Sequence, residues 1–299
     1  MQETLRNAVA SAGPAPASVP GPASVPGPVS VTAPVSVPAS DADLLTRTAL
    51  AVREAGAALR ALFGEVVRYE SREELMRALA VNDDAALEIL RPALTGLRPQ
   101  ARWVEDELDG GALPPGEWWV VDPAEGNVNH LHALPEWAVT ATLVRENSPV
   151  LTVVHLPLTG ETYTALAGAG AHLDGRPLRV APTTDLGLGI VATSQARPDE
   201  DESVVRRIGS SVTAMLLDAL VVRTSVPATL HLANVAAGRT DVFWQFAGAR
   251  ADLLPGALLV TEAGGHVSDT DGRPWTPRSE SFLATAPGIH AQAVTTLSR

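Results

Sequence analysis

Residues 118–130 constrain the fold of this chain more than any other stretch. Residues 118–121 are apolar and end in two valines, which predicts a buried β-strand. Asp122 and Glu125 follow, with a proline between them and a glycine after them. Proline removes a backbone donor and glycine adopts backbone angles that other residues avoid, so we expect the strand to end abruptly in a tight turn. Two carboxylates near free carbonyls suit Mg²⁺, although solvated acids at a strand end are the simpler interpretation of this stretch alone.

The length and charge of the chain limit the classes of protein it can belong to. With 299 residues, of which 45% are hydrophobic, it can form one two-lobed domain or two domains. The net charge of −12 argues against a general nucleic-acid binder, so we expect no nucleic-acid partner. An anionic small substrate stays open, because metal ions held by carboxylates reverse the local field. The absence of cysteine excludes disulfides, thiolate zinc sites and cysteine nucleophiles.

The sequence carries no sign of a membrane or secretory segment. No apolar run is long enough to span a bilayer. Residues 1–6 lack the basic start and hydrophobic stretch of a secretory signal. We therefore expect no membrane partner and, by default, a cytoplasmic protein.

The chain divides into a low-complexity tail and two lobes. Residues 17–22 repeat directly as residues 23–28, and proline at this density blocks helix and sheet, so residues 1–40 are predicted to be a disordered tail. We expect an N-terminal α+β lobe over residues 41–182 and a C-terminal α/β lobe over residues 183–299.

Two helices are predicted at the start of the first lobe. Apolar residues at steps of three and four between residues 45 and 63 predict a helix that Gly64 ends. A second helix is expected to begin at residues 82–84, where short polar side chains can cap it. Residues 66–69 are predicted to form a short strand between the two.

The rest of the chain is rich in strands. A short strand is predicted over residues 102–107, and a meander of strands over residues 137–175. Residues 189–297 alternate strand and helix, including a helix over residues 227–237 with Pro227 at its first position and another that Asp252 opens. Helices on both sides of mixed sheets imply a layered α/β architecture.

Acidic residues recur at the ends of the predicted elements. They are Asp83 at a helix start, Asp106 and Glu107 after a strand, Asp122 and Glu125 at a strand end, and Asp252 at a helix start. Element ends can bring side chains together at the edge of a sheet, but carboxylates cluster in a cleft only when cations offset their repulsion. Two or three Mg²⁺ ions would do so and would bind a phosphate from their other side.

These elements, in this order, resemble the inositol monophosphatase family of Mg²⁺-dependent, lithium-sensitive phosphatases. The family's strand motif W-x-x-D-P-x-D-G-T-x-N-F is similar to residues 119–130, and its G-E-E motif to residues 105–107. Its W-D-x-A-A-G…E-A-G-G motif is similar to residues 251–256 and 262–265. The resemblance runs from residue 41 to the C-terminus. It implies an α/β (α+β) fold, a layered αβαβα sandwich of the sugar-phosphatase type.

The resemblance also implies a chemistry and a set of site residues. The reaction is hydrolysis of a small phosphate monoester (sugar, cyclitol, nucleotide or amino-alcohol phosphate) by metal-activated water, with two or three Mg²⁺ ions, for which Mn²⁺ can substitute, and the assembly is a possible homodimer. The implied metal ligands are Asp106, Glu107, Asp122, Glu125, Asp252 and the carbonyl of Ala124. The implied catalytic residues are Asp83, Asp106 and Asn127, and the implied substrate-binding residues are Gly126, Asn127, Gln245 and Arg250.

The chain departs from the family at informative positions. Glu125 stands where the family has aspartate, and Asp106 where it has glutamate. Asn127 replaces a threonine and has no hydroxyl to pass on a proton. His130 replaces an aromatic residue, and Gln245 replaces a glutamate that binds a substrate hydroxyl. Since Mg²⁺ requires near-ideal octahedral geometry, the changed ligands are not neutral.

Two explanations of these departures stay open. In the first, the chain is a working phosphatase with compensated ligands and a changed substrate. In the second, the fold has been repurposed for altered chemistry or for ligand binding alone. The first is favoured because every ligand position still carries a carboxylate, and the lost hydroxyl at Asn127 is the main argument for the second.

Other enzyme classes fit the sequence less well. No glycine-rich turn opens an early helix, which argues against a dinucleotide enzyme, and no G-x-S-x-G motif marks a serine hydrolase. His130 and His132 could bind zinc, but two histidines around a turn are more often surface residues by chance.

Overall fold

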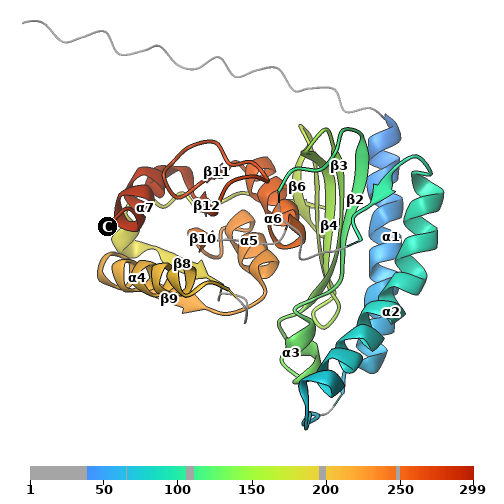
Figure 1. The fold of residues 1–299 in the computed structure, drawn as a ribbon. Coiled ribbons are helices and arrows are strands. Elements are labelled where there is room, and N and C mark those ends of the chain that lie inside the picture. Colours follow the sequence, from blue (N-terminus) through green and yellow to red (C-terminus); the bar gives the residue numbers. More distant parts are fainter. Residues whose placement is uncertain (1–38, 65, 106–110, 195–199, 247–249) are drawn as a thin grey trace, which may run out of the picture. The chain divides into compact units, whose positions relative to one another are not determined.

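Two β-sheets alternate with three layers of helices in the computed structural model of the chain (Figure 1). The model describes residues 39–64, 66–105, 111–194, 200–246 and 250–299, which all lie in one unit that spans residues 34–299. Most of the predicted tail, residues 1–38, lies outside the described residues, and residues 39 and 40 already belong to the first helix.

The first sheet has its strands in chain order, from β1 to β7. The β1–β2 pair is parallel and every other pair is antiparallel, and short turns join consecutive strands from β3 onward. The two-residue turn between β3 and β4 lies at Glu146 and Asn147, which both adopt positive φ, as a type I′ hairpin turn requires. The strands are β1 (Arg102–Trp103), β2 (Glu117–Glu125), β3 (Ala138–Arg145), β4 (Ser148–Leu156), β5 (Glu161–Leu166), β6 (Gly170–Leu173) and β7 (Arg176–Pro177).

The second sheet has the order β11-β12-β10-β8-β9. Three of its five strands, β10, β8 and β9, are parallel to one another, and β12 runs antiparallel to both β10 and β11. The strands are β8 (Ile190–Thr193), β9 (Val221–Thr224), β10 (Val242–Phe246), β11 (His266–Ser268) and β12 (Ser281–Thr285). The first sheet ends before residue 182 and the second begins after it, while the predicted lobe boundary itself stays a prediction.

Helices cover the outer face of each sheet and fill the layer between them. The helices α1 (Ala39–Leu62) and α2 (Arg72–Leu97) lie on the first sheet, and α4 (Glu202–Asp218) and α7 (His290–Leu297) lie on the far side of the second. Between the sheets are α5 (Ala228–Ala236) and α6 (Arg250–Glu262). The short helix α3 (Asn127–Leu131) follows β2, and the 3-10 turns are η1 (Leu186–Leu188) and η2 (Pro287–Ile289). None of the described helices combines the length and apolar character needed to cross a membrane.

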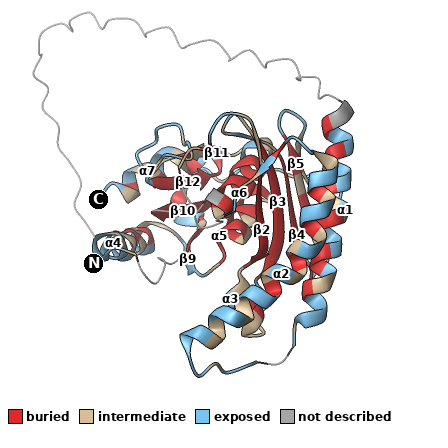
Figure 2. Ribbon diagram, turned by 45° about the vertical axis from the view of Figure 1, so that its right-hand side comes forward, coloured by how far each residue is buried: buried red, intermediate tan, exposed pale blue. Residues whose placement is uncertain are grey.

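Each helical layer packs on its sheet through its own buried core. One core joins α1 and α2 to the first sheet through residues such as Leu59, Leu90 and Trp119. A second joins α5 and α6 to both sheets, and a third joins α4 and α7 to the second sheet. Figure 2 shows buried residues in the sheets and the central helices, and exposed residues along the outer helices. The predicted layered αβαβα sandwich is therefore confirmed.

The central helices pack unusually closely. A Cβ atom added at Gly256 of α6 would lie only 2.3 Å from the side chain of Leu232 on α5. Only glycine leaves room for this approach, so the packing of α6 on α5 depends on the glycine near the centre of α6.

The second helix begins earlier than the sequence predicts. It starts at Arg72, where Ser71 Oγ accepts a hydrogen bond from Glu74 N and Glu74 Oε2 accepts one from Glu70 N. This is a capping arrangement of the S-x-x-E type, and it outweighs the polar residues 82–84 as a start signal. Asp83 therefore lies inside α2, and residues 66–69 form no strand but part of the link between the helices.

The strand that carries the acidic motif also differs from its prediction. It does not stop at Asp122 but continues through Glu125, and the chain turns at Gly126. Pairing with β3 on one side keeps the proline in the strand, since a proline interrupts a ladder only where its missing N–H would donate. Pro227 lies at the N-cap of α5 and not at its first position.

Candidate active site

Asp122 and Glu125 belong to one cluster because β2 is irregular between them. In a regular strand, residues three apart point to opposite faces. Here Asp122 lies opposite Thr140 and Glu125 opposite Ala138, so three steps along β2 match two along β3. The extra residue is a β-bulge, and Asp122 Oδ1 accepts a hydrogen bond from Ala124 N at 3.0 Å across it. The bulge places both carboxylates on one side of the strand.

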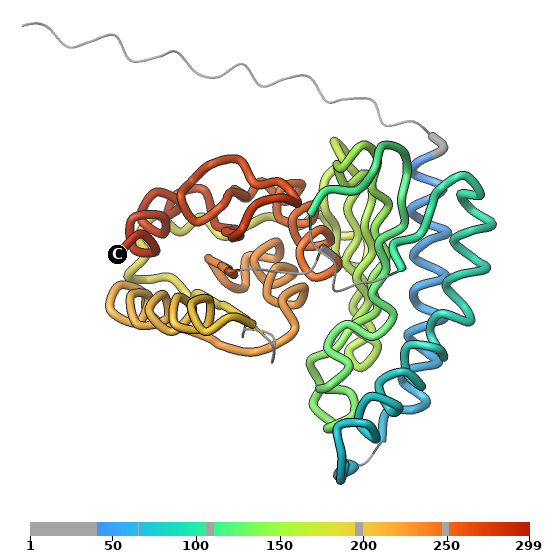
Figure 3. The backbone as a smooth tube through the Cα atoms, viewed as in Figure 1, coloured from blue at the N-terminus to red at the C-terminus, as the bar shows by residue number. Residues whose placement is uncertain are grey.

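Helix α6 brings a third carboxylate from a distant part of the sequence. Asp252 lies in the first turn of α6, beside Ala251 and Leu254, which share a buried cluster with Val120 of β2. Figure 3 shows the green segment with β2 and the orange segment with α6 lying side by side. The position of Asp252 therefore depends on the packing of α6 against the first sheet.

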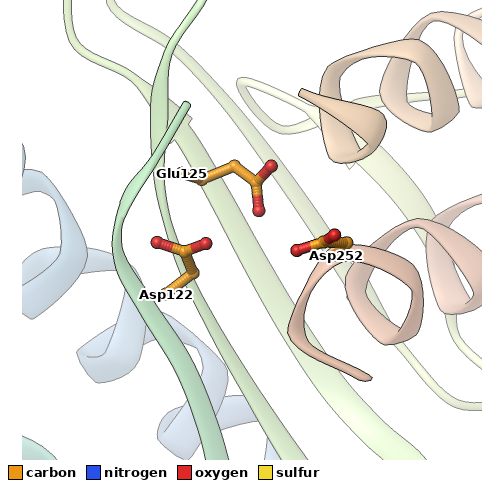
Figure 4. Close-up of side chains that lie close together, drawn as sticks. All are labelled: Asp122, Glu125 and Asp252. Carbon is orange, nitrogen blue, oxygen red and sulfur yellow. The ribbon is translucent and has the colours of Figure 1, made fainter. Parts of the chain in front are cut away.

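The three carboxylates Asp122, Glu125 and Asp252 point toward one another (Figure 4). One oxygen of each lies within 4.8 Å of the others. Asp122 is 8% exposed and Glu125 is 2% exposed. We call this group the carboxylate cluster. Three acids at this spacing, two of them buried and Asp252 half-buried, repel one another unless a proton or a cation lies between them.

The electrostatics of the cluster fit a divalent cation. Burial raises the pKa of Asp122 well above its usual value, and the carboxylates of Glu125 and Asp252 raise it further. A hard cation with oxygen ligands would offset the repulsion among these carboxylates. Among the described residues the donor set is three carboxylates, which suits a hard cation that prefers oxygen ligands.

The structure describes the other predicted metal ligands only in part. Asp106 and Glu107 lie outside the described residues. Glu105, just before them, is bound by Arg91 at 2.9 Å and is turned to that guanidinium. Ala124 is buried within the bulge, and the role of its carbonyl as a ligand stays a prediction.

The chain turns away from the carboxylate cluster at residue 126, a position that only glycine can occupy. Its φ is 81°, and a Cβ atom there would lie 2.8 Å from the carbonyl oxygen of Glu136 and 3.1 Å from Pro227. Gly126 is the N-cap of α3, and its carbonyl accepts from Asn129 N at 2.8 Å. That Gly126 and Asn127 hold phosphate oxygens with their N–H groups stays a prediction.

Asn127 and Asp83 are in direct contact, although they lie on different elements. Asn127 Nδ2 donates to Asp83 Oδ1 at 2.7 Å and to the carbonyl of Leu79 at 3.0 Å. Burial raises the pKa of Asp83 to about 6, and the hydrogen bond from Asn127 opposes this shift. Asp83 therefore contacts the turn after β2 from the interior of α2. This position makes Asp83 a candidate general base.

Two further residues of this region were missed by sequence reasoning. Asn82 Nδ2 lies 2.7 Å from Asn127 Oδ1 and 2.9 Å from His130 Nδ1, and His130 Nε2 lies 2.9 Å from the carbonyl of Leu59. The interpretation of the two histidines as surface residues is wrong for His130, which is 4% exposed. The available signal was that Asn127 and His130 both depart from the family motif in the same turn.

On the second sheet, Gln245 and Ser194 form a polar pair. Gln245 lies near the end of β10 and Ser194 directly follows β8, at the carboxyl edge where ligands bind in sheets of this type. Ser194 Oγ donates to Gln245 Oε1 at 2.6 Å, and both side chains are buried. Arg250 begins α6, but its side chain is outside the described part of the structure, as are residues 195–199.

Two acids outside the carboxylate cluster stabilise the fold. Glu262 accepts hydrogen bonds from the backbone N–H groups of Gly168 and Gly170, both at 2.8 Å, and so ties α6 to the turn before β6. Asp241 accepts from Ile190 N at 2.8 Å and from the hydroxyl of Thr183. These contacts give both acids a structural role.

Comparison with known proteins points to one family. The model of the inositol monophosphatase family matches residues 41–299. The chain is 34% identical to an inositol-1-monophosphatase of Rhizobium meliloti, over 77% of this chain and 86% of that protein. It is 33% identical to the protein named Nus factor SuhB of Pseudomonas aeruginosa, over 64% of this chain and 71% of that protein. The solved structure of an IMPase from Thermotoga maritima superimposes with a TM-score of 0.74 at 26% identity, covering 86% of this chain and 97% of that one.

Proposed function

Because this chain belongs to the inositol monophosphatase family, we propose that it is a Mg²⁺-dependent hydrolase of small phosphate monoesters. The observation that carries the proposal is the convergence of Asp122, Glu125 and Asp252 within 4.8 Å of one another. Two of these residues stand in the strand motif and one in the first turn of α6, so the three implied carboxylate ligands that lie in the described part of the chain come together. Relatives named inositol monophosphatase support the reaction class.

The residues of the chain divide the chemistry between them. The carboxylate cluster holds the metal ions, which when bound supply Lewis-acid activation of water and of the phosphate oxygens. Asp83 accepts the proton of the attacking water directly, because its partner Asn127 has no hydroxyl to relay it. The backbone N–H groups after Glu125 bind the phosphate oxygens, and Asp106 and Glu107 complete the ligand set.

Gln245 is proposed to contact the leaving group of the substrate. Its Oε1 already accepts a hydrogen bond from Ser194, so the side chain offers its amide nitrogen, a donor, to a ligand. A glutamate at this position would accept from a hydroxyl instead. The leaving group that fits this chain therefore carries a hydrogen-bond acceptor near Gln245, and the substrate is a sugar, cyclitol, nucleotide or amino-alcohol phosphate within that limit.

A second candidate is a repurposed protein of the same fold that binds its ligand without hydrolysing it. Asn127 favours this candidate, because the amide can orient Asp83 but cannot pass a proton. A relative that carries the name of a Nus factor shows that the names within the family are not limited to phosphatases. A homodimer and a cytoplasmic location stay predictions under either candidate.

Phosphate release from a substrate panel separates the two candidates. The wild-type chain and an Asp122→Asn variant are incubated with the four classes of phosphate monoester, with Mg²⁺, Mn²⁺ or EDTA. We expect release by the wild type with metal, none with EDTA and at least a hundredfold less from the variant. If no member of the panel is hydrolysed at high protein concentration, the phosphatase proposal fails.

A further inference from the structure

Four buried or half-buried side chains form one continuous hydrogen-bonded network beside the carboxylate cluster. It runs from the carbonyl of Leu59 on α1 to His130, then to Asn82, Asn127 and Asp83. Asn82 is 3% exposed and its amide reaches both neighbours, so it is the centre of the network. The phosphatase chemistry proposed above uses only the last two members.

The carbonyl groups of Leu59 and Leu79 fix the direction of the hydrogen bonds in this network. A carbonyl oxygen only accepts, so the atom of Asn127 that faces Leu79 is its amide nitrogen, and the atom of His130 that faces Leu59 is a protonated Nε2. Asn127 then presents its oxygen to Asn82. His130, as the neutral tautomer, presents an unprotonated Nδ1 to the same residue.

The side chain of Asn82 donates to both of these acceptors. An asparagine amide nitrogen has two hydrogens, and Asn82 uses one for Asn127 Oδ1 and the other for His130 Nδ1. A hydroxyl or a carboxylate at residue 82 could not donate twice. The ring of His130 is held in place by edge contacts with Phe63 and Trp137, at centroid distances of 5.4 and 4.7 Å.

We propose that Asn82 and His130 are positioning residues that hold the Asn127 amide with its nitrogen, and not its oxygen, toward Asp83. In this orientation Asn127 occupies Asp83 Oδ1 and leaves the second carboxylate oxygen to take the proton of the attacking water. The opposite orientation would place the amide oxygen against the carboxylate and repel it. This inference rests on the proposed phosphatase function, and it explains why a chain without the family's threonine carries a histidine three residues later.

A double-mutant cycle tests whether Asn82 acts through Asn127. We expect Asn82→Ala to lower kcat about tenfold with KM and metal affinity within about twofold, because the substrate and metal contacts remain. In the Asn127→Ala background the same change should lower kcat less than about twofold. His130→Phe, which keeps the ring packing, should show a smaller loss with the same dependence on Asn127. Equal losses in both backgrounds would mean a purely structural role and overturn the proposal.

A measurement without metal or substrate separates this inference from the proposed function. Solvent exchange of the Asn127 side-chain amide is measured by NMR in the metal-free wild type, in Asn82→Ala and in Ser211→Ala, a control that removes a buried hydrogen bond to Trp244 elsewhere. We expect exchange to rise at least tenfold in Asn82→Ala and to stay unchanged in the control. Unchanged exchange in Asn82→Ala overturns the inference. If the wild type releases no phosphate, the function fails and this exchange measurement alone decides whether Asn82 positions Asn127.

Discussion

Glu125 reaches the carboxylate cluster with a side chain one methylene longer than the family's aspartate. The β-bulge places it on the same side as Asp122, where it is almost fully buried. We expect Glu125→Asp to keep or raise phosphate release, because the shorter side chain restores the ligand that the family motif carries. The measurement is phosphate release together with Mn²⁺ binding by calorimetry.

The matched control for this substitution is Glu125→Gln, which keeps the length and removes the charge. It should weaken Mn²⁺ binding by roughly tenfold or more, since a neutral amide replaces an anionic ligand. Complete loss of metal binding in Glu125→Asp would show that the geometry proposed for the cluster is wrong.

Asp83 has a raised pKa, which predicts a pH-dependent cost to stability. Its pKa rises from 3.8 in the unfolded chain to about 6 in the fold, so the folded protein binds this proton more tightly between those values. The contribution of protonated Asp83 to the free energy of unfolding is complete below pH 3.8 and is lost as the pH rises through 6. In metal-free protein at pH 7.5, Asp83→Asn should therefore raise the free energy of unfolding by about 1–2 kcal/mol, a value discounted for partial solvent screening.

Urea unfolding at pH 7.5 and pH 4 measures this effect. The stabilisation by Asp83→Asn should shrink or vanish at pH 4, where the aspartate is protonated in the fold. Asp84→Asn, at the exposed neighbouring position, is the control and should change stability little at either pH. An Asp83→Asn effect of the same size at both pH values would contradict the assignment.

At the scale of residues, the sequence predicts carboxylates better than their partners. Asp122, Glu125 and Asp252 stand in motifs, so their convergence could be anticipated from the resemblance. Asn82 and His130 could not be found in this way, because their hydrogen bonds join α1, α2 and the turn after β2. Such contacts depend on how helices pack, and local sequence patterns do not report packing.

At the scale of elements, the turn from β2 into α3 is the most constrained segment of the described site. Gly126 has a φ of 81°, and a Cβ atom would lie 2.8 Å from a carbonyl oxygen. Gly126→Ala should therefore lower the free energy of unfolding by about 2–3 kcal/mol. Gly96→Ala is the control, since it lies in α2 with open space around it and should stabilise by about 0.5–1 kcal/mol. Thermal unfolding of both variants checks the opposite signs, and a neutral Gly126→Ala would contradict the described turn.

Element boundaries show where sequence patterns mislead. The polar residues 82–84 are typical of a helix start, but the cap at Ser71 and Glu74 begins the helix earlier and buries Asn82 within it. Asp122 and Pro123 are typical of a strand end, but pairing with β3 carries the strand through a bulge to Glu125. In the helix a local cap farther upstream outweighs the polar residues 82–84, and in the strand the pairing with β3 outweighs the local signal.

At the scale of the whole described unit, α6 links the chemistry to the fold. It packs against both sheets, its first turn carries Asp252, and Glu262 near its end fixes the turn before β6. The layered architecture was predictable, because a meander of strands followed by alternating strands and helices allows few arrangements. The bulge that aligns Asp122 with Glu125 was not predictable, since it appears only in the register between β2 and β3.

The central claim is that Asp122, Glu125 and Asp252 form a metal centre, and a crystal soaked in Mn²⁺ tests it most directly. We predict anomalous density between these three carboxylates in the wild type, and its loss or marked weakening in Asp122→Asn crystals of the same form. Millimolar Mn²⁺ that leaves no anomalous density between the three carboxylates of the wild type would contradict the account.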